Sequence, residues 1–233
     1  WETIAPYTIE EAYEVADAIE RQAWGELEGE LGDLLLQVVY FAQIGAEEGR
    51  FDLDAIARGV GDKMVARHPH VFGEESREKS ADQQVVDWEA QKAAERAARG
   101  ETRALDGVAL GLPALTRAAK LQKRAARVGF DWDEPAAVTA KIAEEAAELA
   151  EARGTGDTDA MEDELGDLLF TVVNLARHLG LDPEAALRRT NAKVERRFAA
   201  VEDGLAARGA SLADAGLDEM EALWQAAKRA ERG

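Results

Sequence analysis

The chain has 233 residues, a formal net charge of −19, 46% hydrophobic residues and no cysteine. This charge argues against a nucleic-acid backbone or an anionic membrane surface as the main partner, since both are polyanions that require a basic face. Without cysteine there is no disulfide framework and no thiolate site. Because no apolar stretch approaches the ~20 residues of a membrane span, we expect a soluble, cytoplasmic protein.

The composition favours helices throughout. Proline occurs only five times, and apolar residues recur at three- and four-residue spacing, so the chain is predicted to be all-α. The first helix is predicted to begin at Thr8, which forms a capping-box pattern with Glu11, and to run toward Trp24. A turn centred on Gly25 then leads into a second helix that carries Leu31.

The middle of the chain contains the best candidate for a linker. Residues 99–112 include several glycines, and Pro113 follows them, which breaks the helical pattern. We therefore predict an N-terminal module over residues 1–98 and a C-terminal module over residues 113–233. Trp1 already lies inside a helical unit, so the N-terminal module is expected to be truncated at its start.

Several helices are predicted after the linker, and the bounds of the first three follow from the sequence. The first lies within Leu115–Trp132. The second begins with Asp133 as its N-cap and Pro135 in its first turn, and it ends at residues 154–156, where two glycines flank a threonine. The third runs from about residue 159 to residue 178.

An acidic pattern occurs twice in the chain. It consists of two adjacent glutamates, a third glutamate one turn later and, further on, a glutamate and an aspartate one turn apart. The two copies, 134 residues apart, are Glu10, Glu11, Glu14, Glu30 and Asp33, and Glu144, Glu145, Glu148, Glu164 and Asp167. Between Glu10 and Ala42 the copies align without a gap, and 16 of the 33 positions are identical. Such a repeat indicates two equivalent modules.

The spacing predicts that the four carboxylates of each copy converge. Residues three apart on a helix project from the same face, one turn above each other. In an antiparallel hairpin of helices, two residues at equal sequence distance from the turn lie opposite each other at the same height. Gly156 is the sequence midpoint of the pair Glu148 and Glu164, and it is also the midpoint of the pair Glu145 and Asp167. The corresponding pairs of the first copy also share one centre, so each module is predicted to form the same acidic box.

Four converging carboxylates are predicted to bind a metal. They repel one another and resist ionisation unless a cation neutralises them. Ligation by oxygen alone selects hard ions, Mg²⁺ first and Mn²⁺ second, and water and substrate phosphates usually complete a Mg²⁺ site. The alternative is the solvated face of an amphipathic helix. One such motif alone would favour that alternative, whereas two ungapped copies favour a metal site with one or two ions.

Basic residues near the acidic motifs are candidates for phosphate contacts. Lys141 lies one turn before Glu144, and Lys193 and Arg197 share a face of a later helix. Phosphate oxygens that no metal covers need such donors. The alternative, that these are ordinary surface residues, is equally compatible with the pattern.

Further motifs accompany the acidic patterns in a fixed order. They are residues 67–72, residues 120–122, residues 128–132 and residues 191–198. With these motifs the chain closely resembles, over essentially its whole length, the MazG family of nucleoside triphosphate pyrophosphohydrolases in a tandem arrangement. The resemblance implies all-α modules that dimerise through helical bundles and use Mg²⁺ to cleave nucleoside triphosphates to the monophosphate and pyrophosphate.

The resemblance also implies roles for single residues. The implied metal ligands of the C-terminal module are Glu145, Glu148, Glu164 and Asp167, and those of the N-terminal module are Glu11, Glu14, Glu30 and Asp33. The implied substrate contacts are Lys141, Lys193, Arg197 and Trp224, although Trp224 can equally anchor the last helix in the core. The family's usual Cys-Pro-Trp-Asp start is absent, so the C-terminal module is expected to be the active one.

These observations lead to a mechanistic hypothesis. Metal-activated water attacks the α-phosphorus and pyrophosphate leaves on the far side, with Glu145 holding the metal and Glu144 orienting the water or accepting its proton. The alternatives are a carboxylate-bridged di-metal oxidase, whose usual Glu-x-x-His pairs are missing, and a non-catalytic acidic helical scaffold. Apolar rows on more than one helix face predict a homodimer.

Overall fold

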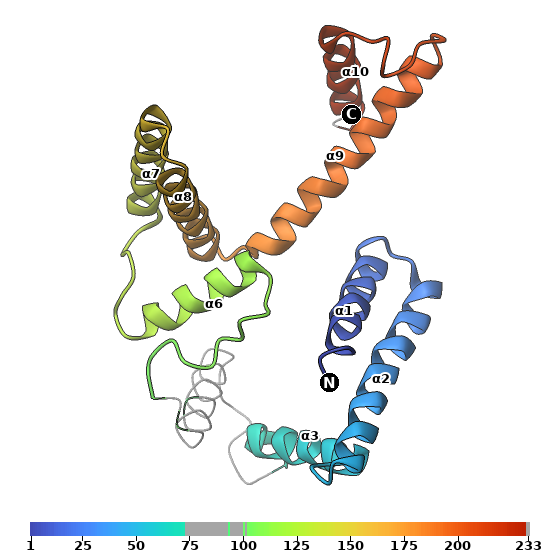
Figure 1. Cartoon of the computed structure of the whole chain (residues 1–233), viewed down its shortest axis with the longest axis vertical. Coiled ribbons are helices and arrows are strands. Elements are labelled where there is room, and N and C mark those ends of the chain that lie inside the picture. Colours follow the sequence, from blue (N-terminus) through green and yellow to red (C-terminus); the bar gives the residue numbers. More distant parts are fainter. Residues whose placement is uncertain (73–92, 94–99, 101, 232–233) are drawn as a thin grey trace. The chain divides into compact units, whose positions relative to one another are not determined.

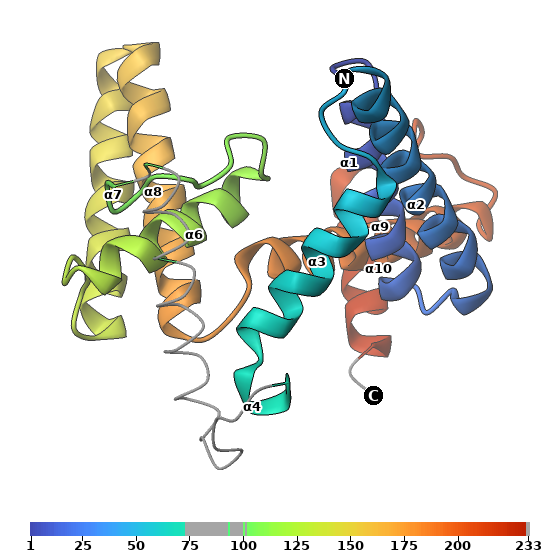
Figure 2. The ribbon, with the colours of Figure 1, turned by 90° about the horizontal axis from the view of Figure 1, so that it is seen from below.

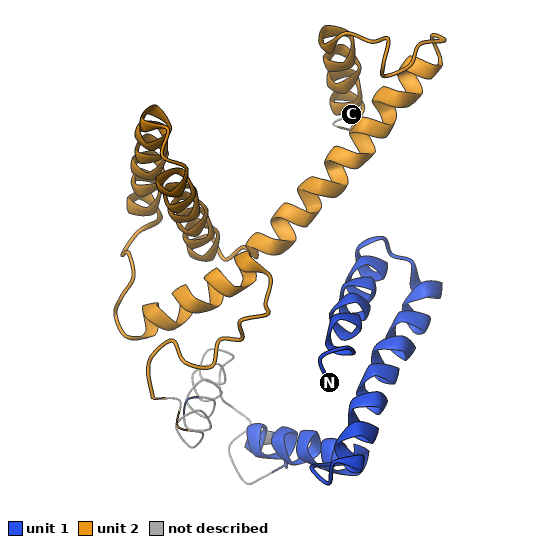
Figure 3. Cartoon of the chain, viewed as in Figure 1, with its two compact units in different colours: residues 1–95 blue, residues 96–233 orange. Residues whose placement is uncertain are grey.

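The computed structural model describes residues 1–72, 93, 100 and 102–231. Every regular element in these residues is a helix, so the all-α prediction is confirmed for the described part of the chain. The chain divides into two compact units, residues 1–95 and 96–233 (Figure 3). Part of the predicted linker and the end of the predicted N-terminal module lie outside the described residues. Among the described helices, none is both long enough and apolar enough to cross a membrane.

Unit 1 is built on a hairpin of two helices (Figure 1). Its helices are α1 (Ala5–Glu20), α2 (Trp24–Glu47), α3 (Leu53–Arg67) and the short α4 (Pro69–Phe72). The first two helices pack along each other, and α3 packs against α2. Asp52 caps α3, because its side chain accepts a hydrogen bond from the backbone N–H of Ala55 at 2.7 Å.

The start of α1 and the turn after it differ from the prediction. The helix begins at Ala5 with Pro6 in its first turn, where the missing N–H of proline leaves no helical hydrogen bond unmade. Thr8 therefore lies inside the helix, and its hydroxyl donates to a carbonyl one turn earlier at 3.4 Å, so the predicted capping box is wrong. The turn lies at Gln22, with a left-handed φ of 56°, and Gly25 belongs to α2.

The described part of unit 2 contains two helical hairpins and one further helix. Its described helices are α6 (Ala114–Arg127), α7 (Pro135–Thr155), α8 (Thr158–His178), α9 (Pro183–Ala206) and α10 (Leu217–Ala230). α7 and α8 lie side by side in Figures 1 and 2, and α9 packs against α10. α6 packs against α8 and α9.

A two-residue turn fixes the α7–α8 hairpin. Gly156 ends α7 with a left-handed φ of 75°, which glycine adopts without strain. Asp157 caps α8 by accepting hydrogen bonds of 3.1 and 3.2 Å from two backbone N–H groups of its first turn. The short turn sets α7 and α8 antiparallel, and it determines which of their residues lie level.

One predicted helix end differs from the structure. The helix predicted within Leu115–Trp132 is α6, which ends at Arg127 and is followed by Gly129 with a left-handed φ of 84°. A non-helical segment then leads to α7, whose N-cap is Glu134 rather than Asp133. The prediction of Asp133 as N-cap is therefore wrong by one residue.

Few of the described apolar side chains are buried within one chain. The described apolar residues that are buried are Ala18, Ala42, Val138, Ala152, Val173, Val201 and Leu205. Larger apolar side chains on several helices stay open to solvent, including Leu35 on α2, Leu169 on α8 and Phe198 on α9. Monomeric soluble proteins rarely leave such large apolar surface uncovered, so these faces are candidates for contact with another chain.

Candidate metal centre

Three carboxylates meet on the α7–α8 hairpin. Glu145 of α7 and Glu164 and Asp167 of α8 each place one oxygen within 4.8 Å of the other two. Glu145 is buried, Glu164 is half-buried and Asp167 is exposed, so the cluster runs from the interior to the solvent. The helical turn between Glu164 and Asp167 and the tight hairpin turn together produce this convergence.

Lys141 is paired with two glutamates at this cluster. Its Nζ lies 2.7 Å from an oxygen of Glu144 and 2.8 Å from an oxygen of Glu145. The hydrogen bonds to Glu144 and then to Glu145 raise the pKa of Lys141, so the amine stays protonated at neutral pH. The Glu145 side chain is only 6% exposed, and a carboxylate buried this deeply requires a cationic partner. Glu144 lies on the solvent side, with 57% of its side chain exposed.

Glu148 lies beside the cluster, and the charge of the cluster affects its pKa. Burial raises the pKa of Glu148, and the carboxyl groups of Glu145 and Glu164 raise it further, while Lys141 opposes them. Glu148 and Glu145 are close enough to hydrogen-bond when one of the two is protonated. Negative charge is therefore crowded here, and a divalent cation would relieve the repulsion.

The α1–α2 hairpin carries the corresponding cluster of the first copy. Oxygens of Glu11, Glu14 and Glu30 lie within 4.8 Å of one another. Burial raises the pKa of Glu11 and of Glu30, and neighbouring carboxylates, including Asp33, raise both further. The first copy thus has the same crowding of negative charge.

The two clusters differ at one basic position. The residue that aligns with Lys141 in the first copy is Tyr7, which is 55% exposed. Among the described residues, no ion pair joins a lysine or arginine to Glu11, Glu14 or Glu30. Only the second cluster therefore holds a lysine where a phosphate contact is predicted.

The other predicted substrate contacts lie on a different hairpin. Lys193 and Arg197 belong to α9 and Trp224 belongs to α10. The guanidinium carbon of Arg197 lies 5.7 Å from the centroid of the Trp224 ring, within the range of a cation–π contact. In the part of the chain that the structure describes, no hydrogen bond or ion pair joins these three residues to the α7–α8 carboxylates.

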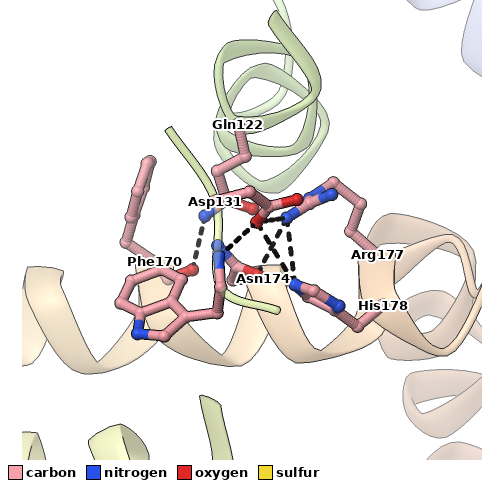
Figure 4. A network of polar contacts seen from close by, with 7 residues as sticks. Gln122, Asp131, Phe170, Asn174, Arg177 and His178 are labelled. Atoms are coloured by element: carbon pink, nitrogen blue, oxygen red, sulfur yellow. Dashed lines mark hydrogen bonds and ion pairs between the residues drawn. The ribbon is translucent and has the colours of Figure 1, made fainter. Parts of the chain in front are cut away.

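A polar network at the far end of α8 was not anticipated from the sequence. Asp131, in the segment before α7, accepts a hydrogen bond from Arg177, and the Nε2 atom of His178 lies 3.2 Å from the same oxygen (Figure 4). Asn174, only 3% exposed, accepts from Arg177 at 3.1 Å. Burial alone would raise the pKa of Asp131, but the hydrogen bond and charge of Arg177 lower it. The network ties the segment that leads into α7 to the end of α8.

Gln122 joins α6 to the same helix. It is 4% exposed, and its Nε2 donates a hydrogen bond of 2.7 Å to the backbone carbonyl of Phe170 (Figure 4). The sequence carried one signal for this contact, because Gln122 lies at helical spacing from Ala118 and Ala125 on the apolar side of its helix. A polar residue on a buried face requires a hydrogen-bond partner.

The donor atoms of both clusters suit a hard divalent cation. Every described group of the two clusters is a carboxylate, and carboxylate oxygen is the ligand that Mg²⁺ and Mn²⁺ prefer. His178 belongs to the Asp131 network rather than to a cluster. The Glu-x-x-His ligand pairs of di-iron bundle oxidases are therefore missing from the described sites.

Comparison with known proteins adds an independent finding. Residues 1–72 and 133–201 match the family model of the MazG nucleotide pyrophosphohydrolase domain. The chain is 51% identical over 231 residues to a nucleoside triphosphate pyrophosphohydrolase of Escherichia coli K12, covering 98% of this chain and 88% of that protein. It is 40% identical over 227 residues to the nucleoside triphosphate pyrophosphohydrolase/pyrophosphatase MazG of Thermotoga maritima, covering 97% and 86% of the two chains.

Proposed function

Since the chain belongs to the MazG family, we propose that it is a Mg²⁺-dependent nucleoside triphosphate pyrophosphohydrolase. The substrate is a nucleoside triphosphate, and the products are the nucleoside monophosphate and pyrophosphate. The relatives from E. coli and T. maritima carry this activity in their names. The observation that carries the proposal is the convergence of Glu145, Glu164 and Asp167 within 4.8 Å.

The three carboxylates of the second cluster and the neighbouring Glu148 are the proposed metal ligands. Glu145, Glu164 and Asp167 supply the converging oxygens, and Glu148 adds a fourth carboxyl whose raised pKa reflects the same crowding. Bound Mg²⁺, or Mn²⁺ in its place, supplies Lewis-acid activation of water and neutralises phosphate charge. Four carboxylates exceed the one or two that a water-rich Mg²⁺ usually takes, so the site has the capacity for two ions.

Two residues beside the second cluster, Glu144 and Lys141, have proposed roles in the reaction. The water oxygen bonds to the α-phosphorus, and the bond from that phosphorus to the bridging oxygen breaks, so both electrons leave with pyrophosphate. Glu144, exposed beside the cluster, orients the water and accepts its proton. Lys141 remains charged between Glu144 and Glu145, and its ammonium group is the proposed first contact of the triphosphate.

A homodimer is proposed to complete the site. Lys193, Arg197 and Trp224 make no direct bond to the carboxylates within the described residues of one chain, yet phosphate oxygens not covered by metal need donors. Apolar side chains are exposed both on α8, as at Leu169, and on α9, as at Phe198. Packing of the α9–α10 hairpin of one copy against the α7–α8 hairpin of another would cover both faces and supply these contacts.

The proposal assigns catalysis to the C-terminal module, residues 113–233. The N-terminal module, residues 1–98, has the acidic cluster but carries Tyr7 where the second copy has Lys141. It therefore lacks the lysine that we assign to the triphosphate. A cytoplasmic location belongs to the same proposal, since nucleoside triphosphates are held there.

Product analysis tests the proposal. The chain is incubated with a nucleoside triphosphate and Mg²⁺, and the products are followed by phosphorus NMR. We expect the monophosphate and pyrophosphate as primary products, an activity lost in Glu145→Ala and Asp167→Ala, and an activity retained in Glu11→Ala. Orthophosphate and nucleoside diphosphate as primary products would contradict attack at the α-phosphorus. An equal loss in Glu11→Ala would show that both modules catalyse.

A further inference from the structure

A single carboxylate, Glu231, binds two adjacent arginines on the α9–α10 hairpin. Glu231 follows α10 as its C-cap residue. One of its oxygens accepts a hydrogen bond from Nε of Arg196 at 2.8 Å and forms an ion pair with Nη2 of the same residue at 2.7 Å. The other oxygen accepts a hydrogen bond from Nε of Arg197 at 2.8 Å and forms an ion pair with its Nη2 at 2.6 Å. The carboxylate is thus held by four charge-assisted contacts.

These contacts occupy the groups that recognise phosphate. The Nε and Nη2 atoms form the edge with which a guanidinium binds a carboxylate or a phosphate through two parallel hydrogen bonds. Glu231 occupies this edge in Arg196 and in Arg197, and the hydrogen bonds from Arg197 and Arg196 lower the pKa of Glu231. Glu231 therefore stays ionised and takes the position that a phosphate group would take.

Arg197 is the arginine most dependent on this partner. Its side chain is 13% exposed, whereas that of Arg196 is 62% exposed. The Arg197 guanidinium also lies against the Trp224 ring. A guanidinium that is largely withdrawn from solvent is destabilised when it loses its anion, so we expect an anion to pair with Arg197 when no ligand is present. Glu231 meets this need in the free protein.

We propose that Glu231 is an internal competitor of the substrate: its carboxylate pairs with Arg197 and Arg196 in the free enzyme and is displaced by a triphosphate oxygen on binding. This inference rests on the proposed function, because it takes Arg197 as a substrate contact. Glu231 acts through the arginines and touches no reacting atom. It sets how tightly the triphosphate binds and leaves the chemical step unchanged.

A second ion pair of the same hairpin provides a matched control. Arg208, just after α9, pairs with Glu219 of α10 at 3.1 Å. This pair also links the two arms of the hairpin, but it involves neither Arg197 nor Trp224. Glu231→Gln and Glu219→Gln therefore make the same change of charge, and each weakens ion pairing between the two arms of the hairpin. Only the first releases the proposed substrate contact.

Kinetics and calorimetry on the full chain test the proposal together. Glu231→Gln is expected to lower KM for a nucleoside triphosphate by about fivefold or more with kcat unchanged, and to tighten binding of Mg²⁺–tripolyphosphate by a similar factor. Glu231→Asp, which keeps the charge, is expected to bind tripolyphosphate nearly as weakly as the parent chain. Glu219→Gln should leave both constants unchanged.

A thermal readout separates competition from a purely structural role. Glu231→Gln should unfold at a lower temperature without ligand, yet gain more from added tripolyphosphate than either the parent chain or Glu219→Gln. An unchanged or raised KM, or equal ligand effects in both glutamine variants, would overturn the proposal while the hydrolase assignment stands. Tighter tripolyphosphate binding in Glu231→Gln without turnover in any variant would support the competitor and refute the hydrolase.

Discussion

Replacement of Glu145 by glutamine is expected to separate metal binding from folding. Without metal, the substitution removes the partner of Lys141 but also relieves the repulsion from Glu148, Glu164 and Asp167. These two effects oppose each other. Lys141 also keeps Glu144 as a partner at 2.7 Å, so the melting temperature in EDTA should change little.

The effect of metal on the parent chain sets the magnitude. A ligand present at 100 times its Kd stabilises the folded state by about 2.7 kcal/mol. For chains of roughly this size, 1 kcal/mol corresponds to about 2–4 °C in Tm, so saturating Mg²⁺ should raise Tm by about 5–10 °C. Loss of the buried ligand should reduce this increase in Glu145→Gln to below about 2 °C.

Differential scanning calorimetry with and without Mg²⁺ measures this difference. Glu151→Gln is the matched control, because Glu151 is an exposed glutamate of the same helix outside the cluster. This control should keep the full Mg²⁺-dependent increase. If Glu145→Gln kept it as well, the α7–α8 cluster would not be the metal site.

Three further predictions concern the same hairpin. Lys141→Met should raise KM for the triphosphate by about tenfold in steady-state kinetics, because a charge-assisted phosphate contact is lost; an unchanged KM would remove Lys141 from the substrate contacts. Since the pKa of Glu148 is raised, the folded chain holds the carboxyl proton of Glu148 more tightly than the unfolded chain does. Without metal, this proton binding therefore stabilises the folded chain at low pH, and the stabilisation is lost as the pH rises through the folded pKa. Metal needs the ionised carboxyl, so the Mg²⁺-dependent increase in Tm should shrink as the pH falls through the raised pKa of Glu148, and an increase independent of pH would contradict the assignment. Asp131→Asn should lower Tm by about 2–4 °C, because Arg177, 20% exposed, loses its ionised partner; thermal melting measures this, and an unchanged Tm would show that the network does not stabilise the fold.

Local sequence patterns were sufficient to predict the helices and the place where the carboxylates converge. Gly156 ends α7, and the three-residue spacing of Glu164 and Asp167 sets one face of α8. Symmetry about the turn then predicted which residues of α7 and α8 lie opposite each other, and the structure brings Glu145, Glu164 and Asp167 together. These features depend only on helix geometry and on one tight turn.

Contacts between distant segments could not be predicted in this way. Asp131 meets Arg177 across 46 residues, and Arg197 meets Glu231 across 34 residues. Helical periodicity reports the face on which a residue lies, but it does not report which residue of another helix lies opposite. The start of α1 was misplaced for a different reason, since the sequence offers both Pro6 and Thr8 as start signals and the proline determines the first turn.

Anomalous scattering from Mn²⁺ tests the central claim most directly. Crystals of the chain with Mn²⁺ and a non-hydrolysable nucleoside triphosphate should show a peak roughly 2 Å from carboxylate oxygens of Glu145, Glu164 and Asp167, in contact with phosphate oxygens. A fully occupied nucleotide with no anomalous peak between α7 and α8, or with its only peak away from these carboxylates, would contradict the account.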